Sequence, residues 1–136
     1  MIKFTDLFLE YKMYIEGNSQ YGVKVVKDYN YNTSHFPIID FNYQDSRESN
    51  DSTVDKIEYY DNEYLEVVLY VKDAGDVSRN VITEELINLT HKFLGRYKGM
   101  KRTGCRKIPN MDTSVLRTLM TYEFQYGNVY GNIVRR

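Results

Sequence analysis

The sequence predicts a single α+β domain with a mainly antiparallel sheet of four or five strands, an N-terminal helix and a second helix packed on the sheet. Its 136 residues match the size of one domain. Apolar side chains repeat with a helical period over residues 4–15 and 82–93, and they alternate as in strands between and after these segments. This irregular order of helices and strands is typical of the α+β class. At 42% hydrophobic and 15% aromatic residues, the chain can bury a core.

The N-terminal segment is predicted to be an amphipathic helix that ends near Gly17. Its apolar residues share one face: Phe4, Leu7, Phe8, Tyr11 and Ile15. Residues 21–29 alternate and are rich in β-branched valine, which favours a strand. A second strand is predicted over residues 38–43. It follows Pro37, because a proline at the first position of a strand removes no hydrogen bond from the sheet.

Residues 44–55 are predicted to form a flexible polar loop, because residues 44–53 contain no apolar side chain. The next segment, 57–71, has the strongest strand pattern in the chain. One side of it carries Leu65, Val67, Leu69 and Val71, and the other carries Tyr64, Glu66, Val68 and Tyr70.

The second helix is predicted to begin after Ser78, a residue type that caps helix N-termini, and to end at Gly95 or Gly99. Its apolar stripe consists of Ile82, Leu86, Leu89 and Phe93. Residues 102–109 and 114–126 then predict a C-terminal hairpin with a turn between them. The domain therefore covers residues 1–126, and the polar, glycine-rich residues 127–136 form a tail.

The sequence contains no pattern that points to catalysis, to a metal or to a cofactor. Neither His35 nor His91 has a Cys, His or Asp at a spacing used for metal ligation, and no glycine-rich phosphate-binding motif is present. A nuclease-like site built on Asp40 and Lys72 would need an acid where Tyr70 stands. We therefore expect a protein that is not an enzyme and needs no cofactor.

The compartment is also constrained by the sequence. A single cysteine, Cys105, excludes an internal disulfide and favours a reducing environment. No stretch approaches the roughly 20 apolar residues that a membrane-spanning helix needs. We expect a soluble, intracellular protein without a membrane partner.

Charge is divided unevenly along the chain. Residues 1–90 carry 8 basic and 17 acidic side chains, whereas residues 91–136 carry 10 and 2. A basic run lies in the second part: Lys98, Lys101, Arg102, Arg106 and Lys107. Such a run can bind nucleic acid, or it can meet an acidic surface of another subunit in a head-to-tail assembly. The third alternative is that folding intermixes the two signs and leaves no net field.

Three segments, together with the order of elements, resemble the tail terminator or tail-to-head joining proteins of long-tailed bacteriophages, which include related tail-completion and minor capsid proteins. These segments are residues 4–15, residues 64–73 with the helix 82–93, and the closing residues 110–126. The resemblance extends over residues 1–126. It implies a phage or prophage structural protein that forms a six-fold ring on the last ring of the tail tube and stops tube polymerisation.

The resemblance also implies partners and a place in the virion. The ring would contact the tail tube protein on one side and a head-completion protein on the other, with DNA passing through its lumen without sequence-specific binding. The subunit would be made in the host cytoplasm and end at the head–tail interface of the virion. The alternatives are a head-completion, connector or other minor capsid protein, and a small nucleic-acid-binding module.

Two groups of residues are candidates for assembly contacts. The first is a subunit or tube interface made of the basic run together with Tyr64, Glu66 and Tyr70, because tyrosine is common at interfaces. The second is the polar loop, whose charged residues could become ordered at a ring interface: Arg47, Glu48, Asp51 and Asp55.

Overall fold

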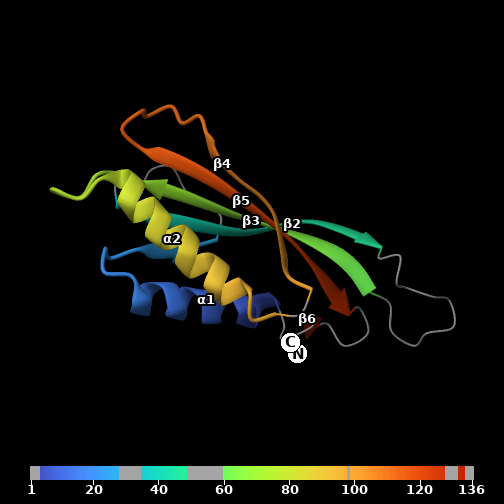
Figure 1. Cartoon of the computed structure of the whole chain (residues 1–136). Coiled ribbons are helices and arrows are strands. Elements are labelled where there is room, and N and C mark those ends of the chain that lie inside the picture. The colour runs from blue at the N-terminus through green and yellow to red at the C-terminus, as the bar shows by residue number, and fades with distance from the viewer. Residues whose placement is uncertain (1–3, 28–34, 49–59, 98, 128–131, 134–136) are drawn as a thin grey trace, which may run out of the picture.

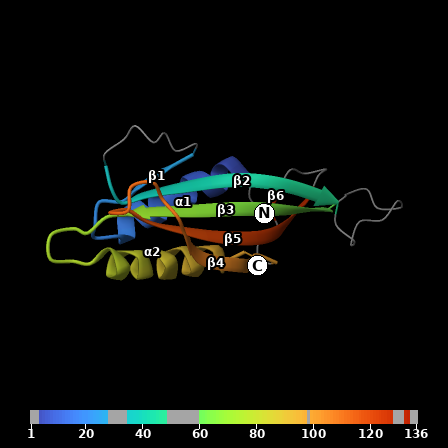
Figure 2. The same cartoon turned by 90° about the horizontal axis from the view of Figure 1, so that it is seen from above.

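The computed structural model describes residues 4–27, 35–48, 60–97, 99–127 and 132–133. These residues form a mixed sheet with two helices on one side of it (Figures 1 and 2). The helices are α1 (Phe4–Asn18) and α2 (Arg79–Leu94). The strands are β1 (Lys24–Val26), β2 (Ile38–Glu48), β3 (Tyr60–Val71), β4 (Lys101–Ile108), β5 (Leu116–Gly127) and β6 (Asn132–Ile133).

The strands lie side by side in the order β1-β2-β3-β5-β4. β1 pairs with β2 in parallel, and the other pairs are antiparallel. The short strand β6 pairs with the last residues of β5, where Tyr126 lies opposite Ile133. Because α2 connects β3 to the outer strand β4, the chain crosses one face of the sheet, and β5 then returns between β3 and β4.

The predicted α+β class, both helices and the C-terminal hairpin are confirmed. α2 begins where the sequence predicts, because the Ser78 hydroxyl accepts a hydrogen bond of 3.1 Å from the backbone N–H of Asn80. Gly95 ends the helix, and its N–H donates to the carbonyl of His91 at 2.9 Å. Local capping chemistry therefore determines where α2 begins, whereas Gly95 at its end has a right-handed conformation (φ −63°) that any residue could adopt.

The sequence-based boundaries differ from the structure at three places. β2 continues to Glu48, although residues 44–48 were predicted to belong to the loop. A register shift between Tyr43 and Asp45 admits an extra residue, after which the polar residues pair with the first part of β3. β1 has three residues rather than the nine expected, and β6 lies within the predicted tail. The remainder of the predicted loop, 49–55, lies outside the described residues.

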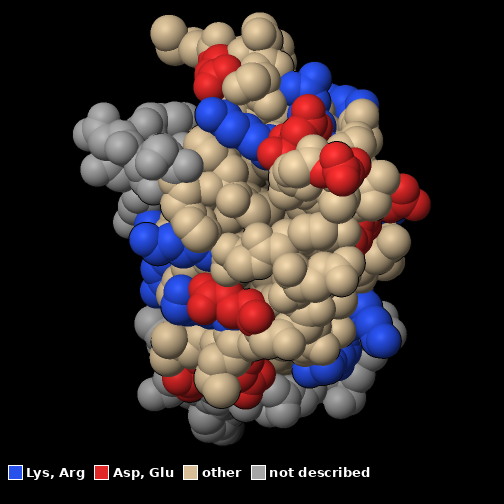
Figure 3. Space-filling model, turned by 90° about the vertical axis from the view of Figure 1, so that its left-hand side faces the viewer, with Lys and Arg blue, Asp and Glu red and all other residues tan. Residues whose placement is uncertain are grey.

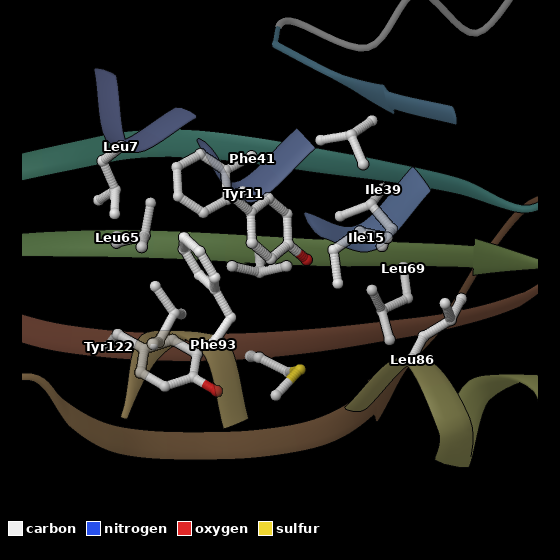
Figure 4. Close-up of a cluster of buried hydrophobic side chains, with 14 of the residues drawn as sticks. Leu7, Tyr11, Ile15, Ile39, Phe41, Leu65, Leu69, Leu86, Phe93 and Tyr122 are labelled. Carbon is white, nitrogen blue, oxygen red and sulfur yellow. The ribbon is translucent and has the colours of Figure 1, made fainter. Parts of the chain in front are cut away.

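The main core lies between the two helices and the sheet (Figure 4). Tyr11 of α1 is at its centre. The Tyr11 ring stacks on Phe41 with centroids 4.5 Å apart and meets Phe93 edge-on at 5.6 Å. The Tyr11 hydroxyl and the Thr90 hydroxyl form a buried hydrogen bond of 2.8 Å, which joins α1 to α2. This contact fixes the two helices against each other as well as against the sheet.

The other face of the sheet, which we call the open face, carries neither of the two helices. A smaller cluster of buried residues lies on it: Ile38, Val68, Tyr70 and Val115. The side chains of Asn42, Tyr64, Glu66 and Thr121 on the same face are half-buried. The sheet therefore presents a mixed polar and aromatic surface opposite its helices.

Loss of the hydroxyl group is expected to change the free energy of unfolding differently at two buried tyrosines, Tyr122 and Tyr11. Tyr122 is 1% exposed, and its hydroxyl has no hydrogen-bond partner within the part of the chain that the structure describes. Tyr122→Phe is expected to leave the free energy of unfolding unchanged or raise it by up to about 1 kcal/mol. Tyr11→Phe leaves the Thr90 hydroxyl unpaired and is expected to cost about 1–3 kcal/mol. Urea titration of both variants measures the difference, and a larger loss in Tyr122→Phe contradicts it.

Candidate functional site

Strand β4 carries four exposed cationic side chains, which we call the basic edge: Lys101, Arg102, Arg106 and Lys107. β4 is the last strand in the sheet order, and its eight residues include no acid. Cations on an edge strand discourage pairing with other strands, which is one structural reason for them. Lys98, the remaining member of the predicted basic run, lies outside the described residues.

The pairing of β4 with β5 divides the basic edge between the two faces of the sheet. Lys101 lies opposite Glu123, and Arg106 lies opposite Leu119, so both belong to the open face. By the same register, Arg102 opposite Tyr122 and Lys107 opposite Thr118 belong to the helix side. A phosphate backbone that follows one face would therefore meet two of the four cations, which weakens the prediction of a nucleic-acid groove.

A β-bulge lies in the middle of the basic edge, with Lys101 and Arg102 before it and Arg106 and Lys107 after it. Thr103 is the extra residue between Arg102 and Gly104, and its hydroxyl donates a 2.9 Å hydrogen bond to the hydroxyl of Thr121. A Cβ at Gly104 would lie 2.9 Å from that same Thr121 oxygen. A larger residue at Gly104 would therefore force the Thr121 side chain to move. A shallow hollow on the open face, lined in part by Leu119, lies at this bulge.

The three other predicted interface residues lie on the open face as expected from their alternation. Tyr64 pairs with Glu123 and Glu66 with Thr121, and both side chains are half-buried. Tyr70 is only 2% exposed, because Ile38 packs beside it and the Arg117 guanidinium lies 5.5 Å from its ring centre. Tyr70 therefore stabilises the fold and offers little surface to a partner.

The predicted assembly loop is brought only partly into the described structure. The backbones of Arg47 and Glu48 belong to β2, where they pair with Asn62 and Asp61. Asp51 and Asp55 lie outside the described residues.

The two helices carry five carboxylates, which we call the acidic helix surface: Asp6, Glu10 and Glu16 of α1, with Glu84 and Glu85 of α2. Three cations lie on the same helices, Lys12 on α1 and Arg79 and Lys92 on α2, so only α1 has a net negative charge. Glu16 accepts hydrogen bonds from the Lys12 ammonium at 2.6 Å and from the backbone N–H of Val25 at 3.1 Å. Burial acts to raise the pKa of Glu16, but these bonds lower it by more, so the carboxylate stays charged.

The two signs of charge intermix at one end of the molecule (Figure 3). There the Lys72 ammonium lies 3.6 Å from an Asp112 carboxylate oxygen, and Asp73 accepts a 2.7 Å hydrogen bond from the backbone N–H of Arg79. The sequence asymmetry thus disappears at this end. The asymmetry survives between β4, which carries four cations and no acid, and α1, which carries three carboxylates and one lysine.

The residues that could suggest an enzyme are not brought together. Asp40 lies opposite Val68, four residues before Lys72 along β3, a separation of about 13 Å at the usual rise of a strand. The Asp40 carboxylate accepts a 2.8 Å hydrogen bond from Asn42, while Lys72 lies over the ring of Phe36. A ring nitrogen of His35 lies 2.8 Å from the carbonyl of Gly22. Across the described ranges, no group of three or more His, Cys, Asp or Glu side chains could hold a metal ion.

Comparison with known proteins gives no family for this chain. No family model matches the sequence, and no curated protein matches it. Of the helices in the described ranges, none has the length and hydropathy needed to cross a membrane.

Sequence reasoning missed the exposed apolar side chains. Leu9 and Val81 are each 54% exposed, Met13 is 76% exposed, and Met111 is fully exposed. Met111 stands between the turn-forming residues Asn110 and Asp112. An apolar residue in such a turn has no core to enter, and that pattern is the signal that could have identified it.

Proposed function

We propose that this chain is a structural protein of a bacteriophage or prophage that forms a ring on the end of the tail tube, stops tube polymerisation and makes the tail side of the head–tail joint. The observation that supports the proposal is the contrast in charge between the basic edge and α1, the part of the acidic helix surface that has a net negative charge. Surfaces of opposite charge on different parts of one subunit favour head-to-tail contacts. Such contacts form a closed ring when the rotation between neighbouring subunits adds up to a full turn.

The proposed mechanism is termination by shape. One face of the ring binds the last ring of the tube, and the other face lacks a second copy of that binding surface. A further tube subunit therefore finds no site, and growth ends. The mechanism needs binding surfaces and no chemical step.

The test is an assembly assay with the tail tube protein of the same phage or prophage. Tubes are polymerised with and without the protein at several ratios, and their lengths are measured by electron microscopy. We expect shorter tubes with a blunt density at one end as the ratio rises. Tubes that keep the same length distribution at every ratio, with no protein at their ends, would contradict the proposal.

Reversing two charges of the basic edge is expected to weaken the ring. Lys101→Glu with Arg102→Glu places carboxylates where β4 is proposed to meet the neighbouring acidic helix surface. Because like charges across an interface are unfavourable, we expect at least a tenfold loss of ring formation or tube docking. Both side chains are exposed, so circular dichroism and the urea midpoint should remain unchanged.

The matched control reverses two lysines at the other edge of the sheet. Lys24 of β1 and Lys27 just after it are exposed, so Lys24→Glu with Lys27→Glu changes the net charge by the same amount. Mass in solution and tube docking are compared at low and high salt. An equal loss in both double variants would mean that net charge, rather than the basic edge, controls assembly.

A further inference from the structure

Among the described residues, no strand pairs with the outer backbone edge of β4. β4 is the last strand in the sheet order and pairs with β5 on its other side (Figure 1). β6 pairs with β5 at Tyr126 and Gly127, beyond the point where Lys101 begins β4, so it does not cover this edge. In an edge strand, alternate N–H and C=O groups point away from the sheet. An extended segment of another chain can form hydrogen bonds with such an edge.

The regular part of this edge lies after the β-bulge. Residues 104–108 pair one for one with residues 117–121 of β5. These five residues match the common length of a strand. The side chains of Cys105, Arg106 and Lys107 are all exposed, so both faces of this stretch are open to solvent.

The charge along this edge is strongly positive. None of the four cations of the basic edge forms an ion pair with another described residue. The part of β5 that lies opposite carries one acid, Glu123, and one further cation, Arg117. The next acid along the chain, Asp112, lies 3.6 Å from the Lys72 ammonium. The basic edge therefore has an excess of positive charge that the described chain does not balance.

We propose that β4 accepts an acidic extended segment of another protein as an additional strand of the sheet. Backbone hydrogen bonds join the two strands. Carboxylates of the partner lie opposite cations on both faces, because Lys101 and Arg106 belong to the open face and Arg102 and Lys107 to the helix side.

Charge disfavours the described strands of a second copy as the partner. Two β4 strands side by side place cations against cations, which is unfavourable. The outer strand at the opposite edge, β1, has only three residues, begins with Lys24 and is followed by Lys27. The cations that protect the edge from pairing with itself therefore attract a strand of the opposite charge.

This inference goes beyond the proposed function. The proposed ring contact uses the cationic side chains of β4, whereas strand addition also needs its backbone edge. The experiments on strand addition use the separate subunit and contain no tubes, so their results do not depend on tube termination.

Fluorescence anisotropy with a labelled peptide tests the binding. The probe has eight residues, the length of β4, and alternates glutamate with valine. In one control peptide lysine replaces glutamate, and a second control keeps the glutamates but is methylated at every backbone nitrogen. The first control has the wrong charge and the second cannot donate backbone hydrogen bonds, so we expect both to bind at least about tenfold more weakly. Equal binding of the methylated peptide would mean that charge alone holds the probe, and would overturn the inference.

Amide hydrogen exchange locates the bound probe. Exchange should slow at alternate backbone amides of residues 104–108, because these N–H groups then donate to the peptide. The amides of β1, at the other edge of the sheet, should not change. Slowing confined to other strands would place the peptide elsewhere and overturn the inference.

Arg106→Glu with Lys107→Glu tests the charge complementarity. Both side chains are exposed, so the fold should remain intact. We expect the glutamate probe to bind at least about tenfold more weakly and the lysine control peptide at least about tenfold more tightly. Lys24→Glu with Lys27→Glu is the matched control, because it changes the net charge equally at the other edge. An equal effect of the two double variants would overturn the inference.

Other partners of this edge give different results. Duplex DNA that displaces the probe and slows exchange at residues 104–108 would assign the edge to nucleic acid. Self-association of the protein that the probe abolishes would assign the edge to a second copy. Either result overturns the inference.

The outcomes for strand addition and for the proposed function are distinguishable. A protein that ends tubes but does not bind the probe overturns this inference and leaves the proposed function standing. Probe binding at β4 by a protein that leaves tube lengths unchanged supports strand addition and contradicts the proposed function.

Discussion

Replacing Phe41 with alanine is expected to lower the free energy of unfolding by about 3–5 kcal/mol. The Phe41 side chain is fully buried on the helix side of β2. Its ring stacks on Tyr11 at 4.5 Å and lies 6.0 Å from the ring of Phe8. The substitution opens a cavity between the sheet and α1. The rings of Tyr11 and Phe8 are attached to α1, so they can fill this cavity only in part.

Urea or thermal unfolding followed by circular dichroism measures this loss. Leu9→Ala is the matched control, because Leu9 also belongs to the α1 side of the molecule but is 54% exposed. Its expected cost is within about 0.5 kcal/mol. A loss below about 1.5 kcal/mol in Phe41→Ala would mean that α1 is not anchored by this aromatic cluster.

The helices could be predicted from the sequence because their signals are local. The apolar stripe of α1 lies within fifteen residues. α2 has a similar stripe and also a capping residue, Ser78, before its first turn. The end of β2 could not be predicted in this way. Residues 44–48 are polar, and they are strand only because β3, a dozen residues further along the chain, pairs with them. Pairing between distant segments therefore overrides local composition.

The candidate surfaces could also be predicted only in part, because they too depend on pairing between distant segments. The cations of β4 are adjacent in the sequence, so their clustering is readable, but their division between two faces depends on the register with β5. The burial of Tyr70 likewise depends on Ile38 and Arg117, which come from neighbouring strands. Composition thus identifies which residues are charged or aromatic, and only the sheet determines which of them a partner can reach.

The two-layer arrangement also explains how assembly surfaces and core remain separate. Tyr11, Phe41 and Phe93 join the helices to the sheet, whereas the basic edge and the acidic helix surface lie outside that contact. Substitutions on the outer surfaces should therefore change association and leave the core intact. This separation allows the assembly predictions to be tested without loss of the fold.

The folded protein is expected to lose stability steeply above pH 10. Burial raises the pKa of Tyr11 and the pKa of Tyr122 well above the ordinary value of 10.0. Below pH 10 both phenols are protonated in the folded and the unfolded chain, so stability does not depend on them. Above pH 10 the unfolded chain releases these protons while the folded protein retains them, which favours unfolding.

Each of the two tyrosines is expected to contribute about 1.4 kcal/mol of lost stability per pH unit above pH 10, or about 2.7 kcal/mol for both. Urea midpoints measured from pH 8 to pH 12 give the slope, and phenolate absorbance reports the proton release. Tyr11→Phe and Tyr122→Phe should each lower the slope by about 1.4 kcal/mol per pH unit, and the double variant should lower it by about twice that amount. Leu86→Ala, which deletes a fully buried aliphatic side chain, should lower stability at every pH without changing the slope. A slope in the double phenylalanine variant equal to that of the unsubstituted protein would assign the alkaline transition to other groups.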